Sequence, residues 1–295
     1  MDSDRPRRVR NPLADHEFFN SVAEVRHVLP ANCRQGLARS LAIACCLLLF
    51  SGNARAQGFS ITELQYQGGS SFGEYPSSPP GFQNILTLQH ASGWDYGENF
   101  FFLDMKCCEG ADANRDMYLE WYPFLSLGAI TGRDYSWGPI KGIGPLGGVN
   151  WGAQAKVLKI TPGFRFQLDL PGFAFANVDY LYMVDRNQGL AAGGAPKESN
   201  SHLIDFNWAL PFEVAGGTFS LEGHGEWHSP RSNELGASLP YWVLLQPQLR
   251  FDLGKALTGE AGRFYAGIEF HLWINKFGFE DADEVLPQLL LVYRF

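Results

Sequence analysis

Residues Gly262 to Asn275 read GRFYAGIEFHLWIN and alternate between apolar and polar side chains with a period of two. The apolar set is Phe264, Ala266, Ile268, Phe270, Leu272 and Ile274. The polar or amphipathic set between them is Glu269, His271, Trp273 and Asn275. A strand with one face of each kind borders two different environments, so the stretch predicts a half-buried β-strand.

The same alternation recurs along the chain and is interrupted by turn residues. In Thr218–His228, for example, Glu222, His224, Glu226 and His228 share one face. Extending the pattern predicts about twelve strands, at Phe59–Phe72, Gln83–Ala91, Asn99–Lys106, Asp116–Phe124, Leu146–Lys156, Leu158–Leu170, Ala174–Val184, Ser201–Phe212, Thr218–His228, Pro240–Leu253, Arg263–Asn275 and Val285–Phe295. An even number of strands suits a closed antiparallel barrel of the bacterial outer membrane, with both termini in the periplasm.

A continuously apolar stretch, Leu41–Phe50, lies near the start of the chain. Arg34 and Arg39 precede it, and Ala54-Arg55-Ala56 follows it as a small-residue cleavage site. This arrangement is typical of a secretory signal peptide, and the stretch is shorter than the roughly 20 residues of a transmembrane helix. We therefore expect residues 34–56 to be a signal peptide and 57–295 to be the mature domain. Residues 1–33 form an extension without a role that the sequence explains, and a misassigned start codon is the simplest reason for their presence.

Composition narrows the classes of protein further. The mean hydropathy of −0.14 argues against a bundle of transmembrane helices, whereas a barrel with a polar lumen is compatible with it. Residues 1–56 hold eight of the 23 basic residues and five of the 31 acidic ones, which leaves 15 and 26 in the mature chain, a net charge of −11. Such a charge argues against nucleic-acid partners.

Three observations favour a membrane barrel over a soluble sandwich: the export signal, ionisable residues of both signs on the polar faces, and the last strand. Leu289, Leu291, Tyr293 and Phe295 share one face of that strand. A terminal Phe on such a strand resembles the assembly signal of outer-membrane proteins, which implies the barrel-assembly machinery as a partner of Phe295. We expect an all-β, closed transmembrane barrel in the outer membrane of a Gram-negative bacterium, in contact with lipid and lipopolysaccharide.

Connections between the predicted strands alternate in character. Polar, acidic or Gly/Pro-rich connections are expected outside the cell, and tighter turns in the periplasm. The connection Leu125–Pro145 is long although it falls on the periplasmic side, where tight turns are expected, and periodicity does not explain its length. Cys107 and Cys108 are adjacent in an expected loop, where a vicinal disulfide is feasible in an oxidising compartment but two thiols alone are not a metal site. No motif predicts a cofactor.

Several blocks resemble the nucleoside-specific channel-forming outer-membrane proteins, the Tsx/OmpK-type family. These are His90-Ala91-Ser92-Gly93-Trp94 with Phe100–Asp104, Tyr118–Pro123 with Ser126-Leu127, Leu168–Phe173, Gln246–Leu249 and Trp273–Gly278. The resemblance spans nearly all of residues 57–295 and implies twelve strands, passive uptake of nucleosides and, in some members, service as a phage receptor.

A lumen that passes nucleosides should offer aromatic platforms beside polar groups. The inferred lumen faces provide such candidates: Tyr122, Trp242, Trp273, Glu120, Asp205, Asn207, Glu222, Gln246, Glu269 and His271. Each of them has a second interpretation, as a barrel-wall residue that bonds across strands. Lys159, Arg165 and Arg250 should pair with acids in the lumen. Trp94, Trp121 and Tyr293 are interpreted as anchors at the membrane interface.

Two other classes of function remain open. His90 and Ser92 lie two apart on a lipid-facing strand face, an arrangement that resembles outer-membrane lipid A deacylases. Gly93 stands where those enzymes have Asn, and the sequence offers no third catalytic member. The other alternative is a surface receptor or adhesin that acts through the exterior loops without specific transport.

Overall fold

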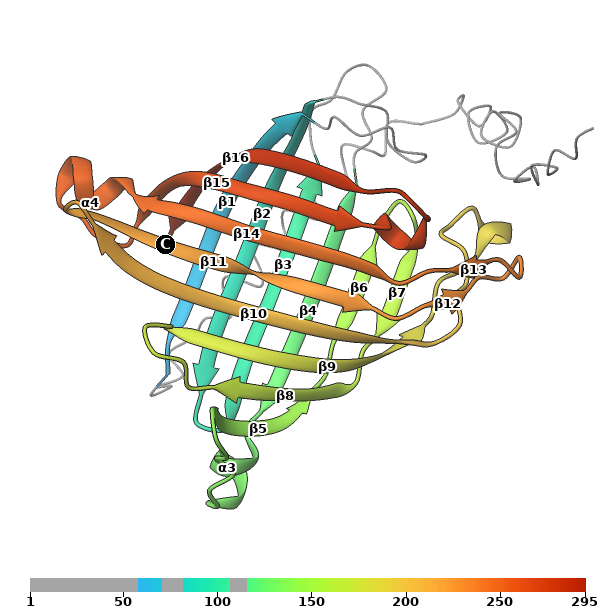
Figure 1. The fold of residues 1–295 in the computed structure, drawn as a ribbon, viewed down its shortest axis with the longest axis horizontal. Coiled ribbons are helices and arrows are strands. Elements are labelled where there is room, and N and C mark those ends of the chain that lie inside the picture. Colours follow the sequence, from blue (N-terminus) through green and yellow to red (C-terminus); the bar gives the residue numbers. More distant parts are fainter. Residues whose placement is uncertain (1–57, 71–81, 107–115) are drawn as a thin grey trace, which may run out of the picture. The chain divides into compact units, whose positions relative to one another are not determined.

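The computed structural model describes residues 58–70, 82–106 and 116–295, which form a closed β-barrel (Figure 1). Its strands are β1 (Ser60–Ser70), β2 (Phe82–Trp94), β3 (Gly97–Lys106), β4 (Met117–Leu125), β5 (Ile140–Leu146), β6 (Val149–Gly152), β7 (Val157–Ile160), β8 (Gly163–Leu168), β9 (Phe175–Asp185), β10 (Ser201–Val214), β11 (Gly217–His228), β12 (Arg231–Ser232), β13 (Ser238–Leu239), β14 (Trp242–Asp252), β15 (Phe264–Ile274) and β16 (Glu284–Arg294). Its short helices are α3 (Leu127–Thr131), η2 (Leu190–Ala192), α4 (Leu253–Thr258) and η3 (Lys276–Gly278).

Antiparallel pairing of successive strands closes the sheet, because β1 pairs with β16 as well as with β2. Two positions in the wall are each shared by two strands, β5 with β6 and β7 with β8. The ladder continues across these breaks, since Gly147 N–H donates to Pro123 O at 3.0 Å and Thr161 N–H to Gly148 O at 2.9 Å. Strands β12 and β13 form a separate two-stranded sheet. Counting each shared position once among the other fourteen strands gives twelve, so the predicted twelve-stranded antiparallel barrel is confirmed.

The predicted fifth strand was misplaced. Its position in the wall runs from Ile140 to Gly152 rather than from Leu146 to Lys156. Glycines hide the alternation there: at Gly144 an added Cβ would lie 1.8 Å from Leu125 O, so no larger side chain fits. The long connection therefore shrinks to residues 126–139, where Ser126 caps the N-terminus of α3 and Gly132 ends it with a φ of 67°.

Burial alternates along the strands as the period of two requires. In β16 the exposed fraction of Leu290 and of Val292 is 0%, whereas that of Val285 is 63% and that of Leu289 54%. The buried set faces the inside of the barrel, and the exposed set forms its outer surface. Leu289, Tyr293 and Phe295 therefore share the outer face, as the sequence predicts.

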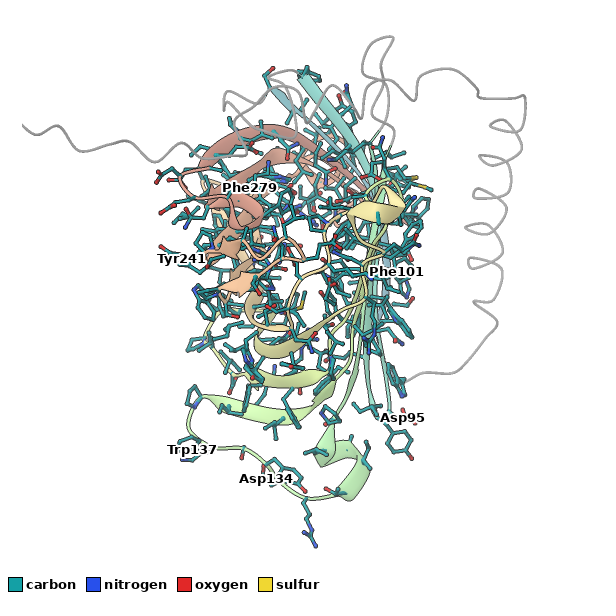
Figure 2. The ribbon with its side chains drawn as sticks, turned by 90° about the vertical axis from the view of Figure 1, so that its right-hand side faces the viewer. Asp95, Phe101, Asp134, Trp137, Tyr241 and Phe279 are labelled. Carbon is teal, nitrogen blue, oxygen red and sulfur yellow. The ribbon has the colours of Figure 1, made fainter. Side chains whose placement is uncertain are left out.

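The two rims of the barrel differ in their connections. The start of β1 and the end of β16 share one rim, because Glu63 pairs with Arg294. This rim also carries the turns at 95–96 and 215–216 and the segments of α3 and α4, and Figure 2 shows Asp95 and Asp134 toward it. We call the opposite rim, with connections 186–200, 229–241 and 275–283, the loop rim. The orientation of these rims across the membrane stays a prediction.

In the described residues, no helix has the length and apolar character needed to cross a membrane. The predicted signal peptide and extension, and Cys107 with Cys108, lie outside the described residues.

Candidate functional site

All ten predicted lumen side chains lie on the inner face of the barrel. They belong to five strands: β4 carries Glu120 and Tyr122, β10 carries Asp205 and Asn207, β11 carries Glu222, β14 carries Trp242 and Gln246, and β15 carries Glu269, His271 and Trp273. Strand pairing aligns their faces, since Asp205 lies opposite Glu226 and Gln248 opposite Glu269. Their role in binding stays a prediction.

Two buried tryptophans, Trp242 and Trp273, form an aromatic cluster near the loop rim with buried His228 and exposed Phe277. The ring centroids of Trp242 and Trp273 are 5.4 Å apart, His228 lies 4.8 Å from Trp242, and Phe277 lies 5.0 Å edge-on from Trp273. We call His228, Trp242, Trp273 and Phe277 the aromatic cluster. Lys276 Nζ lies 5.4 Å from the Trp273 ring centroid, within cation–π range.

Two polar atoms of the aromatic cluster are buried without a hydrogen-bond partner among the described residues, namely Trp273 Nε1 and His228 Nδ1. The other nitrogen of His228 lies 2.9 Å from Ser201 Oγ. Buried polar groups are nearly always bonded, so these two unpaired atoms set the aromatic cluster apart from the rest of the wall. His228 and Phe277 were not among the lumen candidates predicted from the sequence. His228 shares the polar face of Glu222, which was a usable signal.

Tyr122 and Glu120 belong to a second group on β4 and β6. Tyr122 donates to Asn150 Oδ1 at 3.0 Å, and Asn150 Nδ2 donates to Glu120 Oε1 at 2.6 Å. Tyr118 donates to the same Glu120 oxygen at 2.6 Å. The hydroxyl of Tyr122 is therefore engaged within the wall, which supports a structural role for this candidate more than a binding role.

A chain of polar contacts follows the wall from β10 to β15. His224 Nδ1 lies 3.2 Å from Asp205 Oδ1, and His224 Nε2 lies 2.7 Å from Gln246 Oε1. Gln246 Nε2 then lies 2.8 Å from His271 Nε2, which lies 2.6 Å from Glu269 Oε1. Four predicted candidates are thus joined through His224, which the sequence placed on the polar face but did not select.

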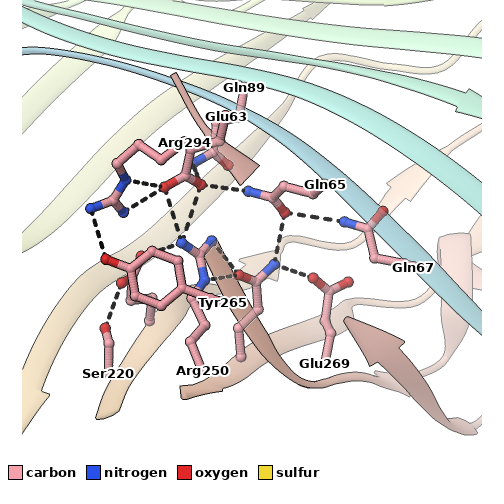
Figure 3. A network of polar contacts seen from close by, with 11 residues as sticks. Glu63, Gln65, Gln67, Gln89, Ser220, Arg250, Tyr265, Glu269 and Arg294 are labelled. Carbon is pink, nitrogen blue, oxygen red and sulfur yellow. Dashed lines mark hydrogen bonds and ion pairs between the residues drawn. The ribbon is translucent and has the colours of Figure 1, made fainter. Parts of the chain in front are cut away.

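Glu63, Arg250 and Arg294 form an ion network at the seam between β1 and β16 (Figure 3). Arg250 also pairs with the predicted candidate Glu222, at 3.0 Å. The predicted pairing of three lumen cations with acids is confirmed, since Arg165 contacts Asp179 at 2.7 Å and Lys159 contacts Glu198 at 2.7 Å. Glu63 itself was missed, although it alternates with Leu64 along β1.

Some of these contacts cross the lumen. Arg250 and Gln248 of β14 bond to Glu63 and Gln65 of β1, and two strands separate β14 from β1 in the wall. On the other side, Gln167 of β8 donates to Glu98 of β3 at 2.9 Å. Because the bonded strands are not neighbours, their side chains constrict the lumen at these levels.

Ion pairs also hold the loop rim. Glu198 in connection 186–200 contacts Arg231 of the next connection at 2.8 Å. Burial raises the pKa of Glu198, but its bonds with Arg231 and Lys159 outweigh this and hold the pKa below the ordinary value. Arg231 Nη2 in turn donates to Phe277 O at 3.0 Å, so the network positions one member of the aromatic cluster.

The His90 and Ser92 pair lies on the outer face, as the sequence predicts. His90 Nδ1 is 2.8 Å from Thr62 Oγ1, and its ring stacks on Phe101 at 5.4 Å. Among the described residues no ion pair joins His90 to a carboxylate. Within the described ranges, the side-chain hydrogen-bond partner of this imidazole is thus the hydroxyl of Thr62.

Comparison with known proteins finds no matching family model. The chain is 22% identical over 183 residues to the outer membrane protein OmpK of Vibrio parahaemolyticus; the match covers 59% of this chain and 66% of that protein, slightly less than two thirds of its length. The NanC porin is 13% identical, with 79% of this chain and all of that chain covered and a TM-score of 0.48. An outer membrane channel from Pseudomonas putida F1 is 10% identical, with 83% and 99% covered and a TM-score of 0.46. The closed antiparallel barrel and the similarity to OmpK place the chain among the β-barrels of the outer membrane of a Gram-negative bacterium.

Proposed function

We propose that this barrel is a passive, non-enzymatic channel for small polar solutes and that nucleosides are its preferred solutes. The observation that carries the proposal is the aromatic cluster with its unpaired atoms, Trp273 Nε1 and His228 Nδ1. The similarity to OmpK and the resemblance of the sequence blocks to nucleoside channels support it further.

A nucleoside matches this chemistry because it combines a planar base with hydrogen-bonding edges and carries no charge. Stacking of a base on an aromatic side chain contributes about 1–3 kcal/mol. Once the side chains that cover them move aside, the indole N–H of Trp273 can donate to an acceptor on a base edge and His228 Nδ1 can make a second polar contact. Gln246, Glu269 and His271 continue the polar path along the wall.

The cross-lumen bonds support a selective channel more than an open one. A solute must move or replace the side chains that join β14 to β1 before it can pass. Solutes rich in donors and acceptors replace such bonds at the lowest cost, because no polar group is then left unpaired. We therefore expect a small open-state conductance.

Single-channel recording in planar bilayers tests the proposal. Adenosine or thymidine should reduce the ion current in a saturable manner, because a solute that fills the lumen displaces mobile ions. Trp273→Ala should weaken this block by roughly 5- to 150-fold, the factor that corresponds to 1–3 kcal/mol. Trp227→Ala is the matched control, since Trp227 lies on the outer face of β11 and is 39% exposed.

Two results would contradict the proposal. A current that ignores millimolar nucleosides but responds to maltodextrins or amino acids would refute the nucleoside preference and leave the barrel intact. An equal effect of the two tryptophan substitutions would show that the aromatic cluster does not hold the solute. Neither the esterase nor the receptor alternative has a comparable arrangement among the described residues.

A further inference from the structure

We propose that Asp205, His224 and Glu226 form a divalent-metal site in the lumen, and that Zn²⁺ is the ion that fits it best. The three side chains offer one nitrogen and two carboxylate oxygens, all within 4.8 Å of one another. The proposal concerns a resident ion and does not depend on which solute the channel passes.

Sheet geometry explains why these residues meet. Asp205 on β10 lies directly opposite Glu226 on β11, and His224 is two residues before Glu226 on the same inner face. Directly opposed residues and residues two apart on one face are nearest neighbours in an antiparallel sheet. The two strands therefore bring three ligand types into one triangle without help from a loop.

The observed spacing suits a tetrahedral ion. In a tetrahedral site, metal–ligand bonds of about 2.0–2.2 Å place neighbouring ligand atoms roughly 3.3–3.6 Å apart. His224 Nδ1 lies 3.2 Å from Asp205 Oδ1 and 3.5 Å from Glu226 Oε1. Calcium needs longer bonds and takes oxygen ligands, so the imidazole favours zinc.

Glu226 provides an independent indication of a missing ligand. Its side chain is about nine-tenths buried, yet among the described residues no hydrogen bond to its carboxylate is found. The one close partner is His224 Nδ1, which Asp205 already approaches. A buried carboxylate without donors is costly, and an ion between the three groups would remove that cost.

The remaining atoms of two ligands are held by neighbours, as is usual for metal-bound side chains. Gln246 Oε1 lies 2.7 Å from His224 Nε2, which directs the opposite nitrogen, Nδ1, toward the two carboxylates. Asn207 Nδ2 donates to Asp205 Oδ2 at 2.7 Å and leaves Oδ1 facing His224.

Zinc stoichiometry tests the proposal directly. The folded full-length protein is equilibrated with ZnCl₂ in detergent, freed of unbound ion by gel filtration, and analysed by inductively coupled plasma mass spectrometry. We expect about one zinc per barrel, a loss of at least tenfold in affinity in His224→Asn and Glu226→Gln, and no change in His202→Asn, which removes an imidazole from the outer face of β10.

Two further measurements keep the result unambiguous. The double variant Cys107→Ser, Cys108→Ser should retain its zinc, and Co²⁺ in the wild-type site should lack the charge-transfer band of a thiolate ligand. Because Glu226→Gln preserves shape, it serves if His224→Asn fails to fold. A wild type that retains no zinc would overturn the proposal, and a protonated His224 would then balance the carboxylates. Zinc that is lost only when the cysteines are replaced would overturn it as well. Neither result bears on conductance, so the proposed channel function is tested separately.

Discussion

Neutralising Glu63 should destabilise the barrel strongly, because this carboxylate holds two arginines across the seam of the sheet (Figure 3). Glu63 and Arg250 are each 1% exposed. Arg250 Nη1 lies 3.1 Å from Glu63 Oε2, while Arg294 Nη2 and Nε lie 2.5 Å and 2.9 Å from Oε1. With Glu222, the two acids and two arginines form a set without net charge.

Glu63→Gln removes one charge from this set and leaves an uncompensated buried cation. Removing one partner of a buried ion pair typically costs about 3–5 kcal/mol. We expect the lower end, about 3 kcal/mol, because Arg250 retains Glu222 and Gln248 as partners. Such a loss lowers the equilibrium constant for folding by roughly 150-fold.

The matched control is Glu213→Gln, the same chemical change at an exposed ion pair. Glu213 lies 3.2 Å from Lys255 Nζ, with side chains 73% and 45% exposed. Exposed pairs contribute about 0–1 kcal/mol, so this variant should unfold almost as the wild type does. Urea titration of the barrel in lipid vesicles, followed by tryptophan fluorescence and by heat-modifiable gel mobility, measures both differences in the free energy of unfolding.

A Glu63→Gln effect below 1 kcal/mol, equal to that of the control, would refute the reasoning. It would mean that water reaches this part of the lumen and solvates, at little cost, the arginines that have lost the charge of Glu63. The lumen would then be wider and wetter than the contacts between β14 and β1 indicate. The stability measurement thus also decides how constricted the channel is.

Three other predictions follow from the faces, the loop rim and the signal sequence. Phe270→Arg should impair assembly far more than His271→Arg in a comparison of folding yields. An arginine that faces lipid costs roughly 2–4 kcal/mol, whereas an arginine at position 271 faces the lumen beside the carboxylate of Glu269. Because the pKa of Glu198 is depressed, its ion pairs stabilise the loop rim at every pH above the ordinary carboxyl pKa, and this contribution is lost as the pH falls through the depressed pKa. Proteolysis within residues 229–241 should therefore rise on acidification of the wild type. Glu198→Gln should already be sensitive to proteolysis at pH 7. N-terminal sequencing of outer-membrane material should begin near Gln57, and any part of residues 1–54 would contradict the predicted cleavage.

The alternation along each strand was sufficient to predict which face a side chain lies on, because that face depends only on whether the position in the strand is odd or even. In β15, His271 and Trp273 point inward and Phe270 outward, as the alternation indicates. The same reasoning failed at residues 140–152, where glycines such as Gly144 carry no side chain and so give no apolar or polar signal. Those positions require glycine because a neighbouring backbone lies close, not because of hydrophobicity. The hydropathy pattern gives no sign of this close approach.

Contacts across the lumen were beyond the reach of periodicity for a different reason. Glu63 and Arg250 are 187 positions apart and lie on strands that are not neighbours. Whether they meet depends on strand tilt and barrel curvature, which register fixes only after the sheet has closed. The sequence identified Arg250 as a lumen cation that needs an acid, but it did not identify which acid.

A lumen crossed by paired charges constrains what can pass in a specific way. An anion that enters must compete with Glu63 for Arg250, and a cation must compete with Arg250 for Glu63. Either competition separates the buried ion pair and leaves one of its members without its partner. A neutral solute with donors and acceptors avoids this cost, because it can replace the contact between Gln248 and Gln65 while the ion pairs persist. In the channel we propose, Trp273 of the aromatic cluster near the loop rim would retain a solute of the same kind. The ion network and the aromatic cluster would then act in the same direction: the first would disfavour charged competitors, and the second would retain a neutral, planar, polar solute.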